Sequence, residues 1–500
     1  MTVHLSILLF WPVAFSLVAA VMPRRLAPVA ALVGALVPLG YAVVMLLDFE
    51  TTGDLQYVTN DTWIEDLGIR YILGVDGLNL WLVALTALLF AIAALWVTLR
   101  PPASRPRLYT FHLGLAETAV LGAFLAQDLI LFVLFFDLML VPFYFLVGQW
   151  GTGPDRVAAT FKLVVYTLVG SLLMLAAAVA TGVLAGTNGE IDFSFAFLSA
   201  NPVSEANQKW LFVAFALAFL IKMPAFPLHG WMPDGYRSMP LPVLAVFSGV
   251  LSKVAAYGFL RVVLPVFPDA TQDYDIVVML IALASILYGS ILAFTQTNSR
   301  LILGYSSMAQ LGFITLGIFA LGQTAGAQGA LLQMVNHGLV VAPLFFIVAL
   351  LSERASGSED LRDMGGIAFR APVLATLFLI VALATLAMPG SANFVGEFLI
   401  LLGVFNAEMA IAIIASTGVA LASVYMLRMY IRSMHNRTGE QVRSFEMSVR
   451  DALVLVPLVA AILAFALYPQ QALEHSEPTV TRIVSTASGD TSVAQEAVTP

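Results

Sequence analysis

The sequence contains no cysteine and very little charge. Asp, Glu, Lys and Arg together make up only 11% of its 500 residues. The absence of cysteine excludes disulfide bonds, thiolate zinc sites and cysteine-ligated iron–sulfur clusters within this chain. The low charge excludes an ordinary soluble domain, in which about 25% of residues are charged. If the protein takes part in redox chemistry, the redox centres therefore belong to a partner.

What the chain has instead is apolar sequence, with 60% hydrophobic residues. A stretch of about 20 apolar residues is long enough to cross a bilayer as a helix. The first stretch has no basic residue before it, so we expect an uncleaved span and not a secretory signal. The pattern predicts an all-α integral membrane protein with about fourteen transmembrane helices, at 3–22, 27–47, 77–99, 109–126, 129–148, 158–185, 208–228, 241–267, 275–296, 301–321, 328–351, 371–403, 406–431 and 452–468. The polar tail after Tyr468, rich in Ser, Thr and Glu, is expected to be loosely ordered.

The basic residues give the predicted orientation. Most of the 23 Lys and Arg residues fall in alternate connectors, and only Arg70, Lys209, Arg261 and Arg482 fall on the other side. Because cytoplasmic loops carry an excess of Lys and Arg, this alternation places both termini outside the cytoplasm. Such a protein has a lipid bilayer around it, and nothing in the sequence indicates nucleic-acid binding.

Three lysines fall inside predicted spans, where a charge at the centre costs about 2.5–3.5 kcal/mol. Lys162 is near a span end and can extend its ammonium to the interface. Lys222, in FLIKMPAFPLHGWMPDGY, precedes Pro224 and Pro227. Each proline removes a backbone donor and clashes with the preceding turn, so the helix is predicted to break here. Broken spans line cavities in transporters, although a kinked span with an extended lysine is the alternative.

A second predicted span also combines a helix break with an ionisable residue, here an acid. In AMPGSANFVGEFLIL, Pro389 and Gly390 are predicted to break the helix about two turns before Glu397. Burial disfavours the charged form of either group, so both can exchange protons near neutral pH; an acid that stays neutral is the alternative. Asp137, also within a predicted span, requires a cationic partner, for which Lys222 is the candidate.

Other polar residues within the spans can extend such a path. Lys253 lies in the span after Lys222, and His337 can titrate near neutral pH, although a lone histidine is often only a hydrogen-bonded core residue. Ser252 and Gln310 can hold water, but such residues also join helices to one another.

The two predicted breaks occupy the same place in two sets of five spans. An offset of five spans is odd, so the two units enter the membrane from opposite faces, which is an inverted-topology repeat. The predicted organisation is residues 1–107 with three N-terminal spans, 108–268 and 269–432 as the two repeats with breaks near Pro224 and Pro389, and 433–500 with the last span and the polar tail.

The segments IKMPAFPLHGWMPD and NFVGEF, with the in-span Lys253, resemble the antiporter-like subunits of respiratory complex I, the proton-pumping NADH:quinone oxidoreductase. The resemblance covers nearly the whole chain. With an acid at Glu397 the chain resembles the M-type subunit, because the L- and N-type subunits carry lysine at this position. The resemblance implies L-type and N-type neighbours and small membrane subunits as partners. It also implies FMN, iron–sulfur clusters and quinone in partner subunits and no cofactor in this chain.

The resemblance also implies roles for individual residues. Asp137 and Lys222 would form an ion pair, Lys253 a central bridge, His337 a relay and Glu397 the terminal proton site. Two positions depart from the family pattern. Asp137 is usually glutamate, so the pair geometry shifts by one methylene, and a histidine is common at the position of Gln310, whose amide cannot titrate.

The expected function is proton translocation driven by redox chemistry elsewhere in a large complex in a bacterial inner membrane. Two alternatives remain open. A subunit of a multisubunit cation/proton antiporter or membrane hydrogenase would share the buried lysines. A membrane scaffold with structural ion pairs would carry the same charges without transport.

Overall fold

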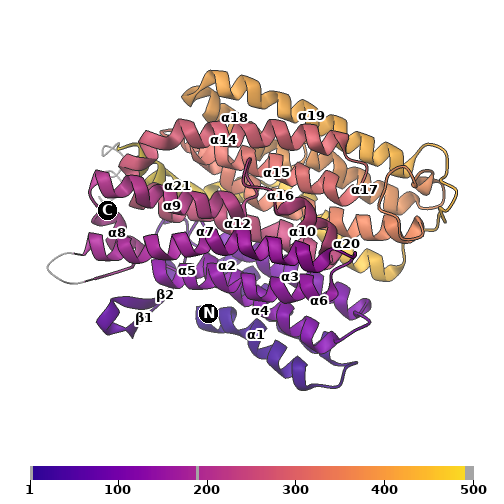
Figure 1. The fold of residues 1–500 in the computed structure, drawn as a ribbon, viewed down its shortest axis with the longest axis horizontal. Helices are drawn as coiled ribbons and strands as arrows, with labels where there is room; N and C mark the ends of the chain where they lie inside the picture. The colour runs from indigo at the N-terminus through magenta and orange to yellow at the C-terminus, as the bar shows by residue number, and fades with distance from the viewer. Residues whose placement is uncertain (1–3, 187–190, 490–500) are drawn as a thin grey trace.

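A computed structural model describes residues 4–186 and 191–489, and the described chain is mainly α-helical (Figure 1). Its elements are α1 Leu5–Val21, α2 Ala27–Asp48, β1 Gln56–Ile64, β2 Ile69–Val75, α3 Leu80–Leu99, α4 Pro106–Leu125, α5 Leu129–Leu138, α6 Leu140–Trp150, α7 Arg156–Ala185, α8 Phe195–Ala200, α9 Glu205–Lys222, α10 Met232–Ser238, α11 Leu241–Val246, α12 Ser252–Gly258, α13 Leu264–Val266, α14 Pro268–Thr295, α15 Ser299–Ile318, α16 Thr324–Arg354, α17 Pro372–Thr385, α18 Ala392–Ala407, α19 Met409–Met434, α20 Val449–Leu467 and α21 Gln470–Ser488.

The long apolar helices confirm an all-α membrane protein. Within the described residues, 11 helices or continuous helical runs are long and apolar enough to cross a membrane. The apolar helices α1, α17 and α18 are shorter. Each of the fourteen predicted stretches overlaps one helix or a run of consecutive helices. The number of spans, the inverted repeats and the four-part division stay predictions.

The interior of the molecule is formed by mainly apolar helices that are buried on every side. The helical run 241–266 and α15 are buried along their whole span windows, and α16 is nearly so. By contrast α2, α7 and α19 expose apolar side chains such as Val33, Leu172 and Ile413. Helices that are apolar all round belong in the interior of a large or membrane-embedded protein, while outward apolar faces suit contact with lipid or neighbouring subunits.

Both predicted helix breaks are confirmed. Helix α9 ends at Lys222 and α10 begins only at Met232, with the proline-containing segment between them. Helix α17 ends at Thr385 and α18 begins at Ala392, on either side of Pro389 and Gly390. The run 241–266 has a further irregularity that the sequence did not indicate. It contains two π-helical turns, η2 (Phe247–Leu251) and η3 (Phe259–Val263).

One expectation about polar residues was wrong. The described part of the tail after Tyr468 is not loosely ordered, because α21 is a regular helix that packs on α13, α14 and α16; residues 490–500 of the tail lie outside the described residues. Arg261, one of the four basic residues outside the alternate connectors, is buried within η3. The segment before α3, for which no element was predicted, forms an antiparallel hairpin of β1 with β2, paired from Gln56 with Val75 to Ile64 with Ile69. The hairpin, α8 and the C-terminal end of α21 lie at one end of the molecule (Figure 1, left).

Candidate functional site

Lys222 lies at the last residue of α9, where the helix stops at the first proline. Its Nζ donates a 2.7 Å hydrogen bond to the carbonyl of Phe136 and sits 3.4 Å from the centre of that ring. The carboxylate of Asp137 is the next side chain along α5, and one of its oxygens is buried without a hydrogen-bond partner among the described residues. The two groups predicted to pair are therefore neighbours, but the described residues contain no direct ion pair between them.

The surroundings of Lys222 are small and mostly apolar. A cavity of about 20 Å³ lies beside it, lined among others by Thr167 and Ser171 of α7 and by Trp231. Nearer the start of α7, Lys162 lines a separate cavity of about 430 Å³. The ammonium of Lys162 was predicted to extend to the interface, and in the structure it forms an ion pair with Asp234 at 2.8 Å. This pair is half-exposed, so water reaches it readily.

Lys253 is the most deeply buried of the charged side chains predicted to act. It is 0% exposed, and its Nζ donates to the carbonyl of Ser248 at 2.5 Å. The π-helical turn η2 makes this contact possible, because it contains Ser248, whose carbonyl the ammonium reaches from five residues further along the chain. The Ser252 hydroxyl donates to the same carbonyl at 3.4 Å, and the hydroxyls of Ser248 and Ser307 lie 3.2 Å apart. The ammonium thus shares its carbonyl acceptor with one hydroxyl, and Ser248 links this contact to Ser307 of α15.

His337 faces this region from α16 and is 2% exposed. Its Nδ1 has no hydrogen-bond partner among the described residues. The backbones of α16 and η2 meet tightly beside it, since a Cβ added at Gly338 would lie 2.6 Å from the carbonyl oxygen of Gly249. Only glycine allows this approach, which brings the histidine and the lysine helix together.

Glu397 is buried in the first half of α18 and is held by two amides. Its Oε1 accepts hydrogen bonds from Gln310 at 2.8 Å and from Gln333 at 3.4 Å. The Gln333 side chain also donates to Oε1 of the Gln310 side chain at 2.8 Å, so the three polar side chains are all hydrogen-bonded to one another. The second carboxyl oxygen, Oε2, is buried with no partner among the described residues.

Several more buried polar groups lie between His337 and Glu397 on the same two helices. Asn336 of α16 donates to the carbonyl of Ala392 at 2.6 Å. Asn393 of α18 is 0% exposed, and neither of its amide atoms has a hydrogen-bond partner in the described part of the chain. Buried polar atoms are normally satisfied, often by internal water. The α16–α18 interface is therefore polar and suited to hold water.

The structure places Glu397 and Gln310 closer together than Asp137 and Lys222. Gln310 and Glu397 are in direct contact, whereas Asp137 and Lys222 are only adjacent. Gln333 and Asp234 were not predicted, because their contacts with Glu397 and Lys162 depend on how the helices pack. Arg261 was a detectable signal, since an arginine within a predicted span requires a buried partner. That partner is Asp76, at 2.6 Å.

The described residues contain no group of three or more His, Cys, Asp and Glu side chains placed to hold a metal ion. The chemistry that this arrangement offers is proton exchange among buried amines, a carboxyl group and an imidazole, with hydroxyls and amides between them.

Comparison with known proteins identifies the family. Residues 126–422 match the family model described as NADH:quinone oxidoreductase/Mrp antiporter, TM. The chain is 34% identical over 506 residues to NADH-quinone oxidoreductase subunit M of Rhodobacter capsulatus, covering 97% of each chain. It is 38% identical over 433 residues to the same subunit of Escherichia coli K12, covering 84% of each.

A solved structure agrees with these relatives. A chain of respiratory complex I from Thermus thermophilus with bound NADH superposes with a TM-score of 0.88 and 28% identity, over 96% of this chain and 99% of that one. The chain therefore belongs to the NADH:quinone oxidoreductase/Mrp antiporter family and, within it, to the group of subunit M sequences, as the resemblance implied.

Proposed function

We propose that this protein translocates protons as the M-type membrane subunit of a NADH:quinone oxidoreductase in a bacterial inner membrane. Both termini would lie on the non-cytoplasmic side. Its neighbours would be the L-type and N-type antiporter-like subunits and small membrane subunits. FMN, the iron–sulfur clusters and quinone would be held by partner subunits, while this chain would serve as a translocase without a redox centre. The names of its relatives and the family match support this assignment.

One observation carries the proposal. Titratable side chains lie on four different helices: Lys253, His337 and Glu397 are buried, and Lys222 is half-buried. A buried ionisable group in a membrane is expensive, and such groups typically mark proton or ion pathways. Two of the four also adjoin an irregularity of the backbone, because Lys222 ends α9 and Lys253 follows the π-helical turn η2.

The first step would be a change at Lys222. In the present conformation its ammonium is bound to the carbonyl of Phe136, one residue from Asp137. A charge or hydration change in a neighbouring subunit would move the ammonium between this carbonyl and the carboxylate. An ion pair at 4 Å contributes about 4 kcal/mol at an effective dielectric constant near 20. Moving one charge against 100 mV requires about 2.3 kcal/mol, so gaining or losing one such pair is sufficient.

The later steps would pass the proton through the interior. Loss of the pair at Lys222 favours release of its proton toward Lys253, whose hydroxyl surroundings can hold intervening water. From Lys253 the proton would pass to the imidazole of His337 and then along the polar α16–α18 interface to Glu397. Gln310 and Gln333 would orient the carboxyl group without titrating, which gives the glutamine a function where relatives often have histidine.

The test is Lys222→Ala in the assembled complex, with Lys209→Ala as the matched control. Lys209 is a half-exposed lysine of the same helix, paired with Glu205 and Asp273. We expect NADH-driven proton uptake by membrane vesicles to collapse in Lys222→Ala and to be unchanged in the control, with both variants assembled. An assembled Lys222→Ala complex that moves protons normally would sink the proposed role.

Two alternatives make different predictions. A cation/proton antiporter subunit would not co-purify with flavin and iron–sulfur proteins, whereas the proposed subunit would. A membrane scaffold would tolerate Lys222→Ala without any change in the protons moved per NADH. The partner list of the purified complex and the vesicle assay together separate the three functions.

A further inference from the structure

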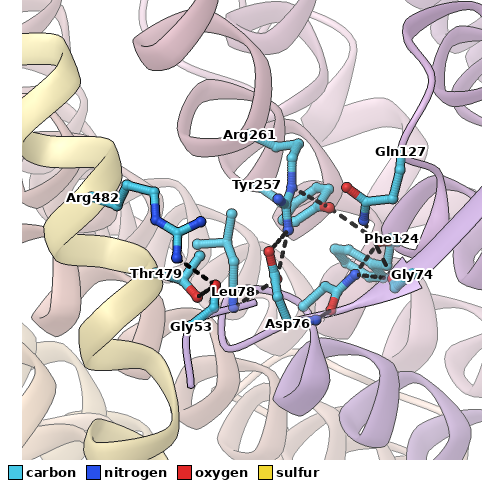
Figure 2. A network of polar contacts seen from close by, with 11 residues as sticks. Gly53, Gly74, Asp76, Leu78, Phe124, Gln127, Tyr257, Arg261, Thr479 and Arg482 are labelled. Carbon is cyan, nitrogen blue, oxygen red and sulfur yellow. Dashed lines mark hydrogen bonds and ion pairs between the residues drawn. The ribbon is translucent and has the colours of Figure 1, made fainter. Parts of the chain in front are cut away.

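A buried ion pair that the proposed proton path does not use joins the hairpin to the lysine helix. Arg261 Nη2 lies 2.6 and 2.7 Å from the two oxygens of Asp76, and the two residues are 8% and 3% exposed (Figure 2). Arg261 Nε donates to the Tyr257 hydroxyl at 2.9 Å, and that hydroxyl donates to the carbonyl of Phe124 at 3.0 Å. Asp76 also accepts from the backbone N–H of Leu78 at 3.0 Å.

The position of this pair relates it to Lys253. Lys253, Tyr257 and Arg261 follow one another at intervals of four residues along the run 241–266. At a rise of 1.5 Å per residue, Arg261 lies about 12 Å further along the helix than Lys253. The π-helical turn η3 contains Arg261, and such turns are frequent at functional sites. The ion pair therefore stands at the end of the same helix that carries the central lysine.

A cavity of about 200 Å³ lies directly against the pair. Its lining includes Asp76, Arg261 and Gln127 on the inner side and Thr479 and Arg482 of α21 on the outer side. The helix α21 is fixed across this cavity, because Arg482 donates to the carbonyl of Gly53 at 2.9 Å (Figure 2). At about 30 Å³ per molecule, the volume suits about six waters.

The lining also offers polar groups to such water. Arg261 has five N–H donors, and its Nη1 forms no hydrogen bond to any of the described residues. A buried ion pair contributes little to stability by itself, since desolvation offsets its attraction. The hairpin could be tethered to the helix more simply by apolar contacts. The charge, the cavity and the unused N–H donors of Arg261 together indicate that the ion pair contacts water in the cavity.

We propose that this cavity is a water-filled vestibule on the face bearing the hairpin and α21, and that the Asp76–Arg261 pair is its inner gate. The inference rests on the proposed proton translocation. While the pair is intact, both oxygens of Asp76 are bonded to the guanidinium, and the guanidinium has only N–H donors, so it cannot accept a proton from water in the vestibule. The network with Tyr257 and Phe124 closes the route toward Lys253. The gate thereby prevents protons from returning through the subunit once they have been moved.

The vestibule is tested directly by cysteine labelling, because the chain has no native cysteine. Gln127→Cys would place a thiol in the lining, and Ala123→Cys, one turn earlier and 0% exposed, is the matched control. In vesicles, a membrane-impermeant thiosulfonate should label Gln127→Cys at least about tenfold faster than the control. Labelling should come from the same face that labels Thr62→Cys on the exposed hairpin. Equal slow labelling of both, or labelling from the opposite face, would overturn the vestibule.

The gate is tested by the double variant Asp76→Asn/Arg261→Gln, which removes both charges and leaves neither orphaned. We expect the complex to assemble and oxidise NADH normally but to lose most of the proton gradient formed per NADH, with faster passive proton leak. Asp76→Glu, which keeps the pair, should retain the gradient. A double variant with an unchanged gradient and leak would refute the gate, even if Gln127→Cys is labelled. If Lys222→Ala leaves proton movement normal, proton translocation itself is refuted. The labelling of Gln127→Cys does not depend on translocation, so the two failures can be told apart.

Discussion

Replacing Lys253 by methionine should separate the function of this lysine from its effect on stability. Methionine has a similar length and shape but no charge. The side chain is 0% exposed, and the ammonium has one strong contact, the 2.5 Å hydrogen bond to the carbonyl of Ser248. That carbonyl keeps a second donor in the variant, because the Ser252 hydroxyl also reaches it at 3.4 Å.

The expected change in stability is small. A lysine ammonium at the centre of a span costs about 2.5–3.5 kcal/mol. A hydrogen bond to a charged group returns about 1.5–3 kcal/mol. Lys253→Met should therefore be near neutral or stabilising by up to about 2 kcal/mol. Lys253→Ala would be a poorer test, because the cavity left by the shorter side chain is itself destabilising.

The expected change in function is large. Without the ammonium no proton can pass from Lys222 toward His337, so proton movement through this subunit should stop. The assay combines native-gel assembly with NADH oxidation and acidification of inverted membrane vesicles. We predict full assembly with a strongly reduced gradient per NADH. Normal proton movement would refute the path, and loss of assembly would show that the lysine is structural.

Three further predictions follow from contacts elsewhere in the chain. Gly338→Ala places a Cβ 2.6 Å from a backbone carbonyl and should destabilise the α16–η2 contact by about 1–3 kcal/mol, measured as reduced assembly, whereas Gly40→Ala, with no atom within 4 Å, should be tolerated. Asp234→Asn breaks only the half-exposed pair with Lys162, so thermal stability should fall by at most about 1 kcal/mol and proton movement should be kept; a complete loss would show that this pair acts in the path. Asn79→Ala removes two buried donations, at 2.9 and 2.8 Å, and should cost about 2–4 kcal/mol in unfolding assays, while a neutral effect would mean that the hairpin is held otherwise.

The sequence was sufficient for the fold class and for both helix breaks. Long apolar runs and helix-breaking residues act locally, so Pro224 and Pro389 revealed the interruptions without any tertiary information. The π-helical turns η2 and η3 could not be predicted in this way, because neither turn contains a proline or paired glycines that would mark it. The helix α21 was missed since its polar sequence lacks the apolar pattern of a span.

The polar partners were the least predictable part of the site. The contact of Glu397 with Gln310 was not expected, and Gln333 was not considered, because amide contacts between helices depend on their packing. The direct contact expected between Asp137 and Lys222 is absent from this conformation for a similar reason. A backbone carbonyl one residue away is an equally good acceptor, and no sequence pattern records that choice. Arg261 shows the opposite case, since a charge inside a predicted span by itself indicates a buried acid nearby.

Infrared difference spectroscopy of the complex during turnover tests the central claim most directly. A protonated carboxyl group has a carbonyl stretch that disappears on ionisation, so a glutamate that exchanges a proton gives a difference band. If Glu397 exchanges a proton, this band is present in the unaltered complex and is lost in Glu397→Gln, which keeps the contact with Gln310. An identical spectrum in the assembled variant would contradict a proton path that ends at Glu397.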